Sequence, residues 1–340
     1  MSLFSFLKKK SQRALGVEIS GRSIRWSEVS IGETAFEIET HGLLGVAYTP
    51  WTQNAEAQQK MIKDLAPLSL YKNIPLVCVL PETLTHTTYI TVGLKSEEEV
   101  TAAVEGAVES YIVEHPVFIT NDTVCLYDII EQNNANITIV ITLYQESKTK
   151  NLKEVFMQLG FSDVSFTPLH DSLQALYMNQ DPTLMLSVAN THTSIIQMTG
   201  GQLQGYAQVP FGARDVVQQI RDVVGPERTE KVYTRYGMKS NHRDSALYAR
   251  IVQQAMPLID HAQRMMTITN KDHAIVITGD YADLPGLDTF LARQLRRVPV
   301  RLDVSQRFLS PDIRLPVIDA HDMLRFAPAL GAAVDYLESR

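Results

Sequence analysis

Two widely separated segments of the chain share one pattern, a short apolar strand followed by a small polar turn and a second strand. The first spans Gly16 to Val29, and the second spans Leu184 to Met198. A turn of this kind presents backbone N–H groups and hydroxyls to one point, where they can hold a phosphate. Two such hairpins predict a duplicated domain that closes on a nucleotide or on its vacated cleft.

Length, charge and cysteine content narrow the class of protein. A single hydrophobic core stops growing near roughly 250 to 300 residues, so a chain of 340 residues is expected to form two domains. The formal net charge of -7 disfavours nucleic acid as a partner, because a polyanion requires a basic surface. Cys78 and Cys125 each lie in an apolar run and are predicted to be buried free thiols in a reducing cytoplasm.

Residues 1–12 place several leucines and phenylalanines beside a run of lysines. We expect a flexible tail, because chain termini are usually loosely held. The alternative is a weak contact with a membrane surface, in which the apolar side chains enter the headgroup region and the lysines meet anionic lipid. No apolar run reaches the roughly 18 residues of a membrane span.

Strand and helix patterns alternate along the chain, which predicts an α/β architecture. The strand candidates are short and rich in Val and Ile: Leu15–Ile19, Ile24–Val29, Ala35–Thr40, Ile74–Leu80, Val124–Ile130, Ile137–Leu143, Leu184–Val188, Ser194–Met198 and Ala274–Thr278. The helix candidates carry apolar periodicity or cap signals: Ser96–Glu114, Asn151–Leu159, Pro168–Met178, Ser245–Thr267, Gly286–Val298 and Ala327–Leu337. Within this order, residues 85–166 form a small unit of their own that looks inserted.

Several short motifs occur in the order and spacing found in actin-like ATPases. Gly16–Ser20 and Leu186–Asn190 resemble the two phosphate loops, and Ile277–Asp280 resembles the adenosine loop. More narrowly, the chain resembles the PilM and FtsA branch of that family. Four segments carry this resemblance: Leu94–Val100, Val209–Asp215, Leu284–Leu287 and Ala327–Ala333. The resemblance covers nearly the whole chain. The component of mannose-sensitive haemagglutinin (MSHA) pilus biogenesis is an equally good match within this branch.

The resemblance implies an actin-like fold, that is, an RNase H-like duplicated domain in two lobes with an inserted α+β subdomain called 1C. In the first lobe, the resemblance implies subdomain 1A at 13–84 and 167–181, with the C-terminal helix 327–340 packing back on it, and subdomain 1C at 85–166. The implied second lobe covers 182–326 and consists of subdomain 2A and, at about 225–271, subdomain 2B. The implied ligand is ATP with Mg²⁺. Its expected contacts are Glu18, Ser20, Gly21, Ser23, Ser187, Asn190, Thr191, Thr193, Gly279 and Asp280, with Glu18 holding Mg²⁺ weakly through a water.

The same motifs depart from the family pattern at the chemically important positions. Actin-like ATPases usually carry Asp-x-Gly in both phosphate loops, whereas this chain has Glu18 and Ser20 in the first and Ser187 and Ala189 in the second. Asp280 adds a carboxylate beside the adenosine loop, and a carboxylate repels phosphate unless a metal lies between them. We therefore expect hydrolysis to be lost and nucleotide binding to be weak or lost with it.

The family resemblance also implies a partner, the cytoplasmic N-terminal peptide of PilN, a single-span membrane protein, which docks on subdomain 1C. The chain is then a cytoplasmic scaffold at the inner membrane, in type IV pilus assembly or a related type II secretion or MSHA system. Other platform proteins or a second copy of the chain are further candidate partners. A groove between the segment 81–93 and the helix from Ser96 is predicted to hold the peptide, through Pro81, Thr87, Tyr89, Thr91 and Glu98.

Two other functions stay open at this point: a working actin-like ATPase and an FtsA-like filament-forming protein. The serines and threonines of both hairpins also have a purely structural reading as turn residues. His192 is expected to be a solvent-facing turn residue. His170 and Asp171, adjacent on a predicted helix, are expected not to face each other.

Overall fold

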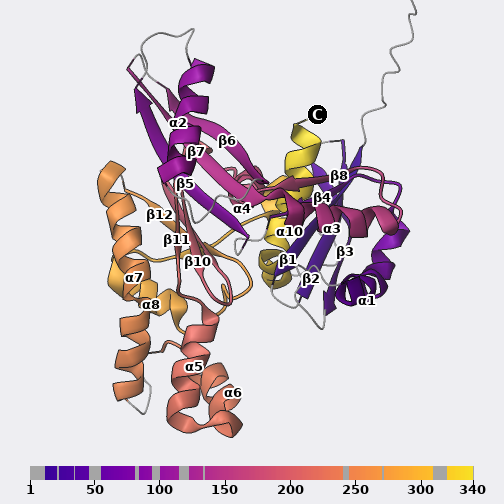
Figure 1. Cartoon of the computed structure of the whole chain (residues 1–340). Helices are drawn as coiled ribbons and strands as arrows, with labels where there is room; N and C mark the ends of the chain where they lie inside the picture. The colour runs from indigo at the N-terminus through magenta and orange to yellow at the C-terminus, as the bar shows by residue number, and fades with distance from the viewer. Residues whose placement is uncertain are drawn as a thin grey trace, which may run out of the picture.

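The described part of the chain forms two five-stranded sheets and a smaller three-stranded sheet, with helices around and between them (Figure 1). A computed structural model describes residues 12–20, 23–33, 35–45, 55–80, 84–93, 100–114, 122–132, 135–239, 245–269, 272–308 and 320–339. The expected α/β class is confirmed. None of the described helices combines the length and apolar character needed to cross a membrane.

The first sheet has the strand order β3-β2-β1-β4-β8. Its strands are β1 (Arg13–Ser20), β2 (Ser23–Ile31), β3 (Phe36–Gly45), β4 (Leu76–Val79) and β8 (Val164–Thr167). One face packs against α1 (Ala55–Leu65), the 3-10 helix η1 (Ala66–Tyr71) and α3 (Glu146–Gln158). Leu15 and Val17 of β1 point into this core, where Phe156 of α3 is fully buried. We call this sheet with its helices the first lobe.

The second sheet repeats the arrangement of the first, with the order β11-β10-β9-β12-β13. Its strands are β9 (Thr183–Val188), β10 (Thr193–Thr199), β11 (Gln202–Val209), β12 (Ala274–Thr278) and β13 (Val300–Arg301). In both sheets an antiparallel hairpin is followed by a parallel strand on its other side. The predicted duplication is therefore present in the topology.

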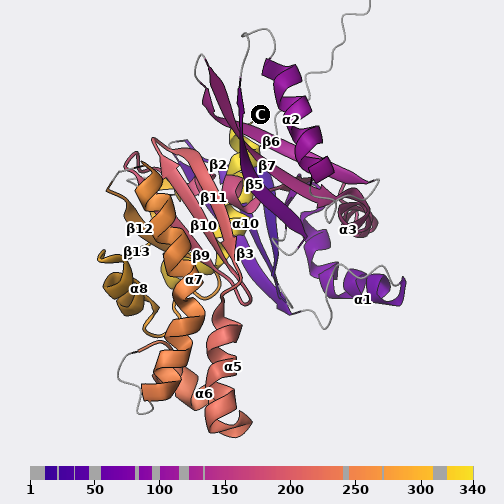
Figure 2. The same ribbon diagram turned by 60° about the vertical axis from the view of Figure 1, so that its left-hand side comes forward.

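Helices surround the second sheet, and we call the whole unit the second lobe. These helices are α5 (Ala213–Val224), α6 (Pro226–Arg235), α7 (Ser245–Thr269), α8 (Leu287–Leu295) and α9 (Ser305–Phe308). Figure 2 shows α7 running along the sheet, while α5 and α6 extend beyond its end.

The third sheet has the order β5-β7-β6 and carries one helix. Its elements are β5 (Thr85–Gly93), β6 (Thr123–Gln132), β7 (Asn136–Gln145) and α2 (Val100–Glu114). Val104 and Val108 of α2 pack on Ile139 and Ile141 of β7. The chain from Glu146 onward packs with the first lobe, since α3 lies in its core and β8 pairs with β4. This unit therefore ends near residue 145, earlier than the boundary at 166 that the sequence predicted.

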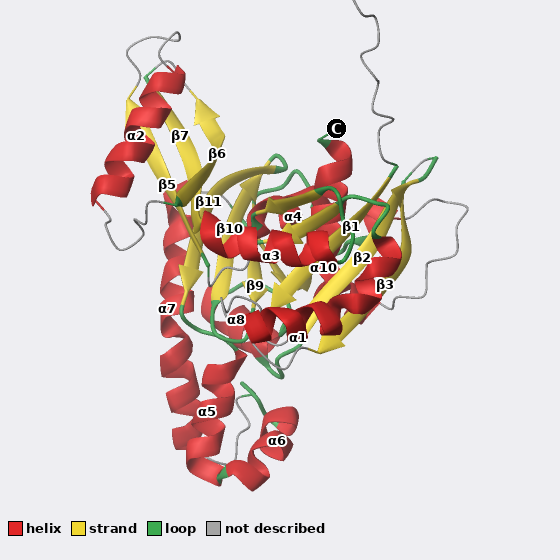
Figure 3. Ribbon diagram, turned by 45° about the vertical axis from the view of Figure 1, so that its right-hand side comes forward, coloured by secondary structure: helices red, strands yellow, loops and turns green. Residues whose placement is uncertain are grey.

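Two helices lie between the two large sheets: α4 (Leu169–Leu176) and α10 (Ala320–Glu338) (Figure 3). They belong to the largest hydrophobic core, which also contains residues of β9, β10 and β12. The two helices approach closely at Gly331, where an added Cβ would lie 1.8 Å from the carbonyl oxygen of Ser172. Only glycine fits this crossing.

Candidate functional site

The two hairpins that open the two large sheets face one cavity. Ser20 and Ser23 of the first hairpin, Asn190 of the second, and Asp280 and Tyr281 after β12 all line it. The cavity volume is about 790 Å³. A cleft between the lobes therefore lies where the sequence pattern predicted it.

The two serine hydroxyls that flank the turn of the first hairpin are engaged in hydrogen bonds. Ser20 Oγ donates to Asp280 Oδ2 at 2.9 Å, which joins the first lobe to the second. Ser23 Oγ donates to the backbone carbonyl of Ser20, also at 2.9 Å, and so stabilises the turn itself. Gly21 lies outside the described residues.

Arg25 of β2 is the central charge of the cleft and was not among the site residues predicted from the sequence. Its Nη1 atom lies 2.5 Å from Asp280 Oδ1 and 3.5 Å from Glu18 Oε2. The side chains of Arg25, Asp280 and Glu18 are only 10%, 11% and 14% exposed, respectively. Burial alone would lower the pKa of Arg25, but the two carboxylates outweigh burial and raise it. The guanidinium is therefore held charged between two acids.

The signal for this pair was present in the hairpin register. Glu18 and Arg25 are directly opposite each other in the antiparallel pairing of β1 and β2. Cross-strand neighbours of opposite charge attract, so a strand pair that ends in a two-residue turn would have placed them together. No local pattern links either residue to Asp280, which belongs to the other lobe.

The second hairpin uses most of its polar side chains inside the protein. Thr193 is fully buried, and its Oγ1 donates to the carbonyl of Phe211 at 2.7 Å. Ser187 is 4% exposed and sits within the sheet, while Thr191 Oγ1 lies 3.1 Å from His192 Nδ1. Among the predicted residues of this hairpin, Asn190 is the one that lines the cleft.

The backbone of the second hairpin is bound by the start of α5. The amides of Ala213 and Arg214 donate to the carbonyls of Ala189 and Asn190, at 3.2 and 2.8 Å. The helix N-terminus, which favours acceptors and anions, is thereby satisfied by the protein's own carbonyls.

Gly279 positions Asp280 at the mouth of the cleft. It has a φ of +93°, and an added Cβ would lie 2.7 Å from the carbonyl oxygen of Val188. The amide of Tyr281 donates to that same oxygen at 3.1 Å. The turn after β12 is therefore fastened to the end of β9, with the side chain of Asp280 directed across to Arg25.

The predicted partner-binding residues of β5 lie on one face of the third sheet. Thr87 Oγ1 is 3.0 Å from Thr142 Oγ1, and Thr91 Oγ1 is 3.2 Å from Thr138 Oγ1. Ile90, between them, packs in the core under α2, so Thr87, Tyr89 and Thr91 face away from that helix. Thr87, Tyr89 and Thr91 therefore do not line a groove together with α2. Pro81 and Glu98 lie outside the described residues.

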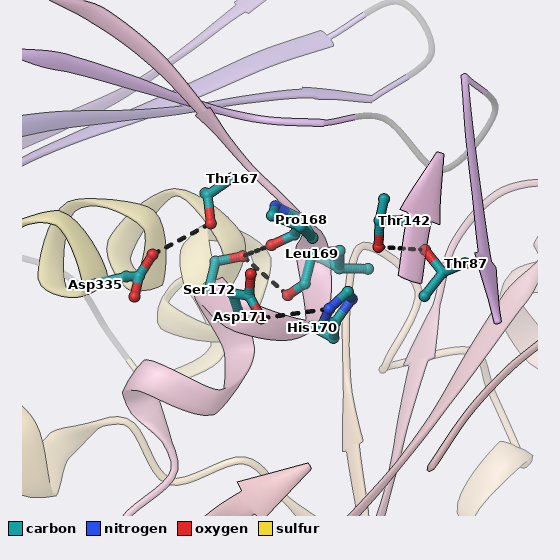
Figure 4. A network of polar contacts seen from close by, with 9 residues as sticks. All are labelled: Thr87, Thr142, Thr167, Pro168, Leu169, His170, Asp171, Ser172 and Asp335. Atoms are coloured by element: carbon teal, nitrogen blue, oxygen red, sulfur yellow. Dashed lines mark hydrogen bonds and ion pairs between the residues drawn. The ribbon is translucent and has the colours of Figure 1, made fainter. Parts of the chain in front are cut away.

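A second cavity, of about 660 Å³, lies where the third sheet meets α4, α10 and the turn between β10 and β11. Its lining combines carboxylates with apolar side chains, namely Asp128, Ile129, Ile130, Asp171, Ala175, Met178, Leu203, Asp335 and Glu338. Arg307 also lines it and pairs with Glu338 at 2.7 Å. Figure 4 shows part of this junction, with Asp335 of α10 accepting a hydrogen bond from Thr167 at 3.2 Å.

His170 and Asp171 do face each other, contrary to the expectation from helical spacing. His170 Nε2 lies 3.3 Å from Asp171 Oδ1 (Figure 4). Burial lowers the pKa of His170 to about 4. Burial, followed by the charges of Asp128 and Asp335, raises the pKa of Asp171 to about 8. Both side chains are therefore neutral near pH 7. Ligand atoms of Asp128, His170 and Asp171 lie within 4.8 Å of one another, a spacing that a metal ion could bridge.

No family model matches the sequence, and no curated protein matches it at a significant level. Solved structures do match. A structure described as the PilM-PilN type IV pilus biogenesis complex superposes with a TM-score of 0.73 at 15% identity, covering 97% of this chain and 98% of that one. The chain has the actin-like fold.

Other structures with this fold agree less closely. MreB5 of Spiroplasma citri bound to ADP gives a TM-score of 0.52 at 8% identity, covering 97% of this chain and 96% of that one. The same protein bound to AMPPNP gives 0.51 at 9% identity, with the same two coverages. At these identities the actin-like fold is what is shared.

Proposed function

We propose that this protein is an actin-like scaffold of type IV pilus assembly, or of a related secretion or MSHA pilus system, with a degenerate nucleotide site. It acts in the cytoplasm at the inner membrane, by binding the N-terminal peptide of a PilN-like membrane protein. The observation that carries this proposal is the likeness over the full length of both chains to a structure described as a PilM-PilN complex.

The contacts in the cleft support the loss of nucleotide binding. A Mg²⁺ ion on Glu18 would stand beside the Arg25 guanidinium, which lies 3.5 Å from that carboxylate, and like charges repel. Ser187 supplies no carboxylate and is buried in the sheet. The amides at the start of α5 are already used by Ala189 and Asn190. The residues present therefore do not suit ATP with Mg²⁺.

The second cavity is the best candidate for the peptide site. It borders β6, an outer strand of the third sheet whose far edge is unpaired among the described strands. An extended peptide can add to such an edge and place alternate side chains in pockets. Met178 and Ile129 are 46% and 45% exposed there, and the carboxyl groups of Asp128 and Asp335 line the same cavity. The cavity therefore suits a peptide with apolar side chains and at least one lysine or arginine.

Titration of a synthetic peptide from the cytoplasmic N-terminus of the PilN-like protein tests this function. Met178→Asp, which puts a charge among the apolar contacts, and Asp128→Lys, which reverses the local charge, are each expected to weaken binding at least tenfold. The matched control is Tyr89→Asp, on the other outer strand of the same sheet and similarly exposed, at 49%. It should bind as the wild type does.

Each outcome of this titration has a distinct meaning. Loss of binding in Tyr89→Asp alone would place the peptide at β5, within the segment 81–93 that was predicted from the sequence to hold it. Absence of binding by the wild type, with the protein folded by circular dichroism, would overturn the proposed partner.

A further inference from the structure

The two lobes are joined across the cleft by side chains of the protein itself. Asp280 of the second lobe reaches both Arg25, at 2.5 Å, and Ser20, at 2.9 Å, of the first lobe. We propose that Arg25 and Asp280 form a clamp that sets the closure of the two lobes without any ligand in the cleft. This proposal rests on the proposed function in one respect: if the cleft binds no nucleotide, closure of the lobes is set by the protein's own side chains.

The burial of the clamp makes it costly to open. Arg25 and Asp280 are about one-tenth exposed, and Glu18 adds a second carboxylate 3.5 Å from the guanidinium. Loss of Arg25 leaves the carboxylates of Glu18 and Asp280 without their shared cation in a poorly solvated place, and the lobes can then lower the free energy by separating and letting water reach these charges. Loss of the Asp280 charge leaves Arg25 paired only with Glu18 of its own lobe, so the charge attraction across the cleft is removed.

The elements that carry the clamp are held rigidly on both sides. Arg25 is in β2, the middle of the three-strand meander of the first sheet. Asp280 follows Gly279, whose backbone is packed against Val188, and precedes Tyr281, whose amide is bonded to Val188. Because neither side chain is on a loose loop, breaking their contact changes the relation between the lobes rather than the position of one turn.

The test measures the distance between the lobes. Spin labels are attached at Leu70→Cys in the first lobe and Val298→Cys in the second, at side chains that are 80% and 82% exposed. The background carries Cys125→Ala, and Cys78 is buried. Without nucleotide, double electron–electron resonance between the two labels should give one narrow distance distribution when Arg25 and Asp280 are unchanged. Arg25→Met and Asp280→Asn should each shift it to longer distances and broaden it.

The matched control is Asp283→Asn. Asp283 is close to Asp280 in the same turn but lies 3.9 Å from Arg301 within its own lobe, so its loss should leave the distance unchanged. Asp280→Asn keeps the shape of the side chain and an acceptor for Ser20, and it carries the test if Arg25→Met does not fold. An unchanged, narrow distribution in the folded Asp280→Asn protein would overturn the clamp.

The same samples separate this inference from the proposed nucleotide loss. Micromolar binding of Mg-ATP by the wild type, with the lobes closed before ATP is added, would overturn the degenerate site and keep the clamp. Lobes that are already open in the wild type, in a protein that binds no ATP, would overturn the clamp and keep the degenerate site.

Discussion

Gly16 of β1 lies against Ala329 of α10, so closely that a Cβ on Gly16 would stand 1.7 Å from the Ala329 carbonyl oxygen. The strand with the first cleft hairpin and the last described helix thus share a contact that leaves no room for a side chain. The first sheet is covered on this face by α10, while its other face is covered by α1 and α3. The position of the cleft hairpin depends on this helix.

We expect Gly16→Ala to destabilise the protein by about 3 kcal/mol or more, because the methyl group meets backbone that can move only with the helix. The measurement is the midpoint of urea unfolding. Gly106→Ala is the control, since an added Cβ there meets no described atom within 4 Å outside the backbone of its own helix, and alanine is the better helix former by up to about 1 kcal/mol. A wild-type midpoint for Gly16→Ala would contradict the close packing of α10.

We expect this protein to bind Mg-ATP far more weakly than an intact actin-like ATPase does, and to hydrolyse it at a negligible rate. The reason is the arginine between Glu18 and Asp280, together with Ser187 in place of a carboxylate. Isothermal titration and a phosphate-release assay check this. Micromolar binding with turnover that Glu18→Ala abolishes would contradict it.

The pair His170 and Asp171 predicts a pH dependence of stability between about pH 6.5 and pH 8. The pKa of Asp171 is raised from 3.8 to about 8, so its neutral form stabilises the folded state fully below pH 3.8, and this contribution is lost as pH rises through 8. His170 has the opposite sign: with a pKa lowered to about 4, its contribution is complete above pH 6.5. The wild-type protein should therefore unfold at a lower temperature at pH 8.5 than at pH 6.5. This difference in unfolding temperature should be larger in the wild type than in Asp171→Asn. Equal margins in the two proteins would contradict the raised pKa.

Asp128→Asn should lower the pKa of Asp171, because the Asp128 charge is one of the causes that raise it. Carbon-13 NMR of labelled aspartate carboxyls measures the shift. Asp260→Asn, an exposed position on α7, is the control and should leave the pKa of Asp171 where it is. An unchanged pKa in Asp128→Asn would place Asp128 farther from the pair in solution.

The two thiols should differ in reactivity toward a disulfide reagent at pH 8. Cys78 is fully buried, and burial followed by the charge of Glu18 raises its pKa. Cys125 is partly exposed, and burial raises its pKa to about 11. We expect no reaction of Cys78 and slow reaction of Cys125 in the folded protein, with both reacting in guanidinium. Fast native reaction of Cys78 would contradict its burial.

The sequence predicted strands of both large sheets where three or four apolar residues follow one another. β9, with Leu184–Leu186, and β12, with Ala274–Ile277, contain such runs, and both strands occur as expected. β11 was missed because its pattern mixes three glutamines and Gly205 with apolar residues. α5 was missed because its N-cap is Gly212, a weak start signal, although Asp215 completes the cap by accepting the Gly212 amide at 2.8 Å.

The sequence predicted which turns line the cleft, but not which side chains contact one another within it. Hairpin patterns are local, so the sequence located the turns that line the cleft. The contact of Ser20 with Asp280 spans the two lobes, and only the packing of two separate sheets brings the two side chains together. Likewise, Thr193 reads as a turn hydroxyl, and only the tertiary fold supplies the Phe211 carbonyl that it binds.

The position of α10 also determines when the first lobe can be completed during synthesis. Strands β1 and β2 of this lobe end at Ile31, whereas α10, which covers one of their faces, begins only at Ala320. A nascent chain therefore exposes the apolar face of these strands until α10 has left the ribosome. Contacts between such distant residues slow folding and leave intermediates open to aggregation. Truncation within α10 should consequently yield insoluble protein, not a folded second lobe with a loose first one.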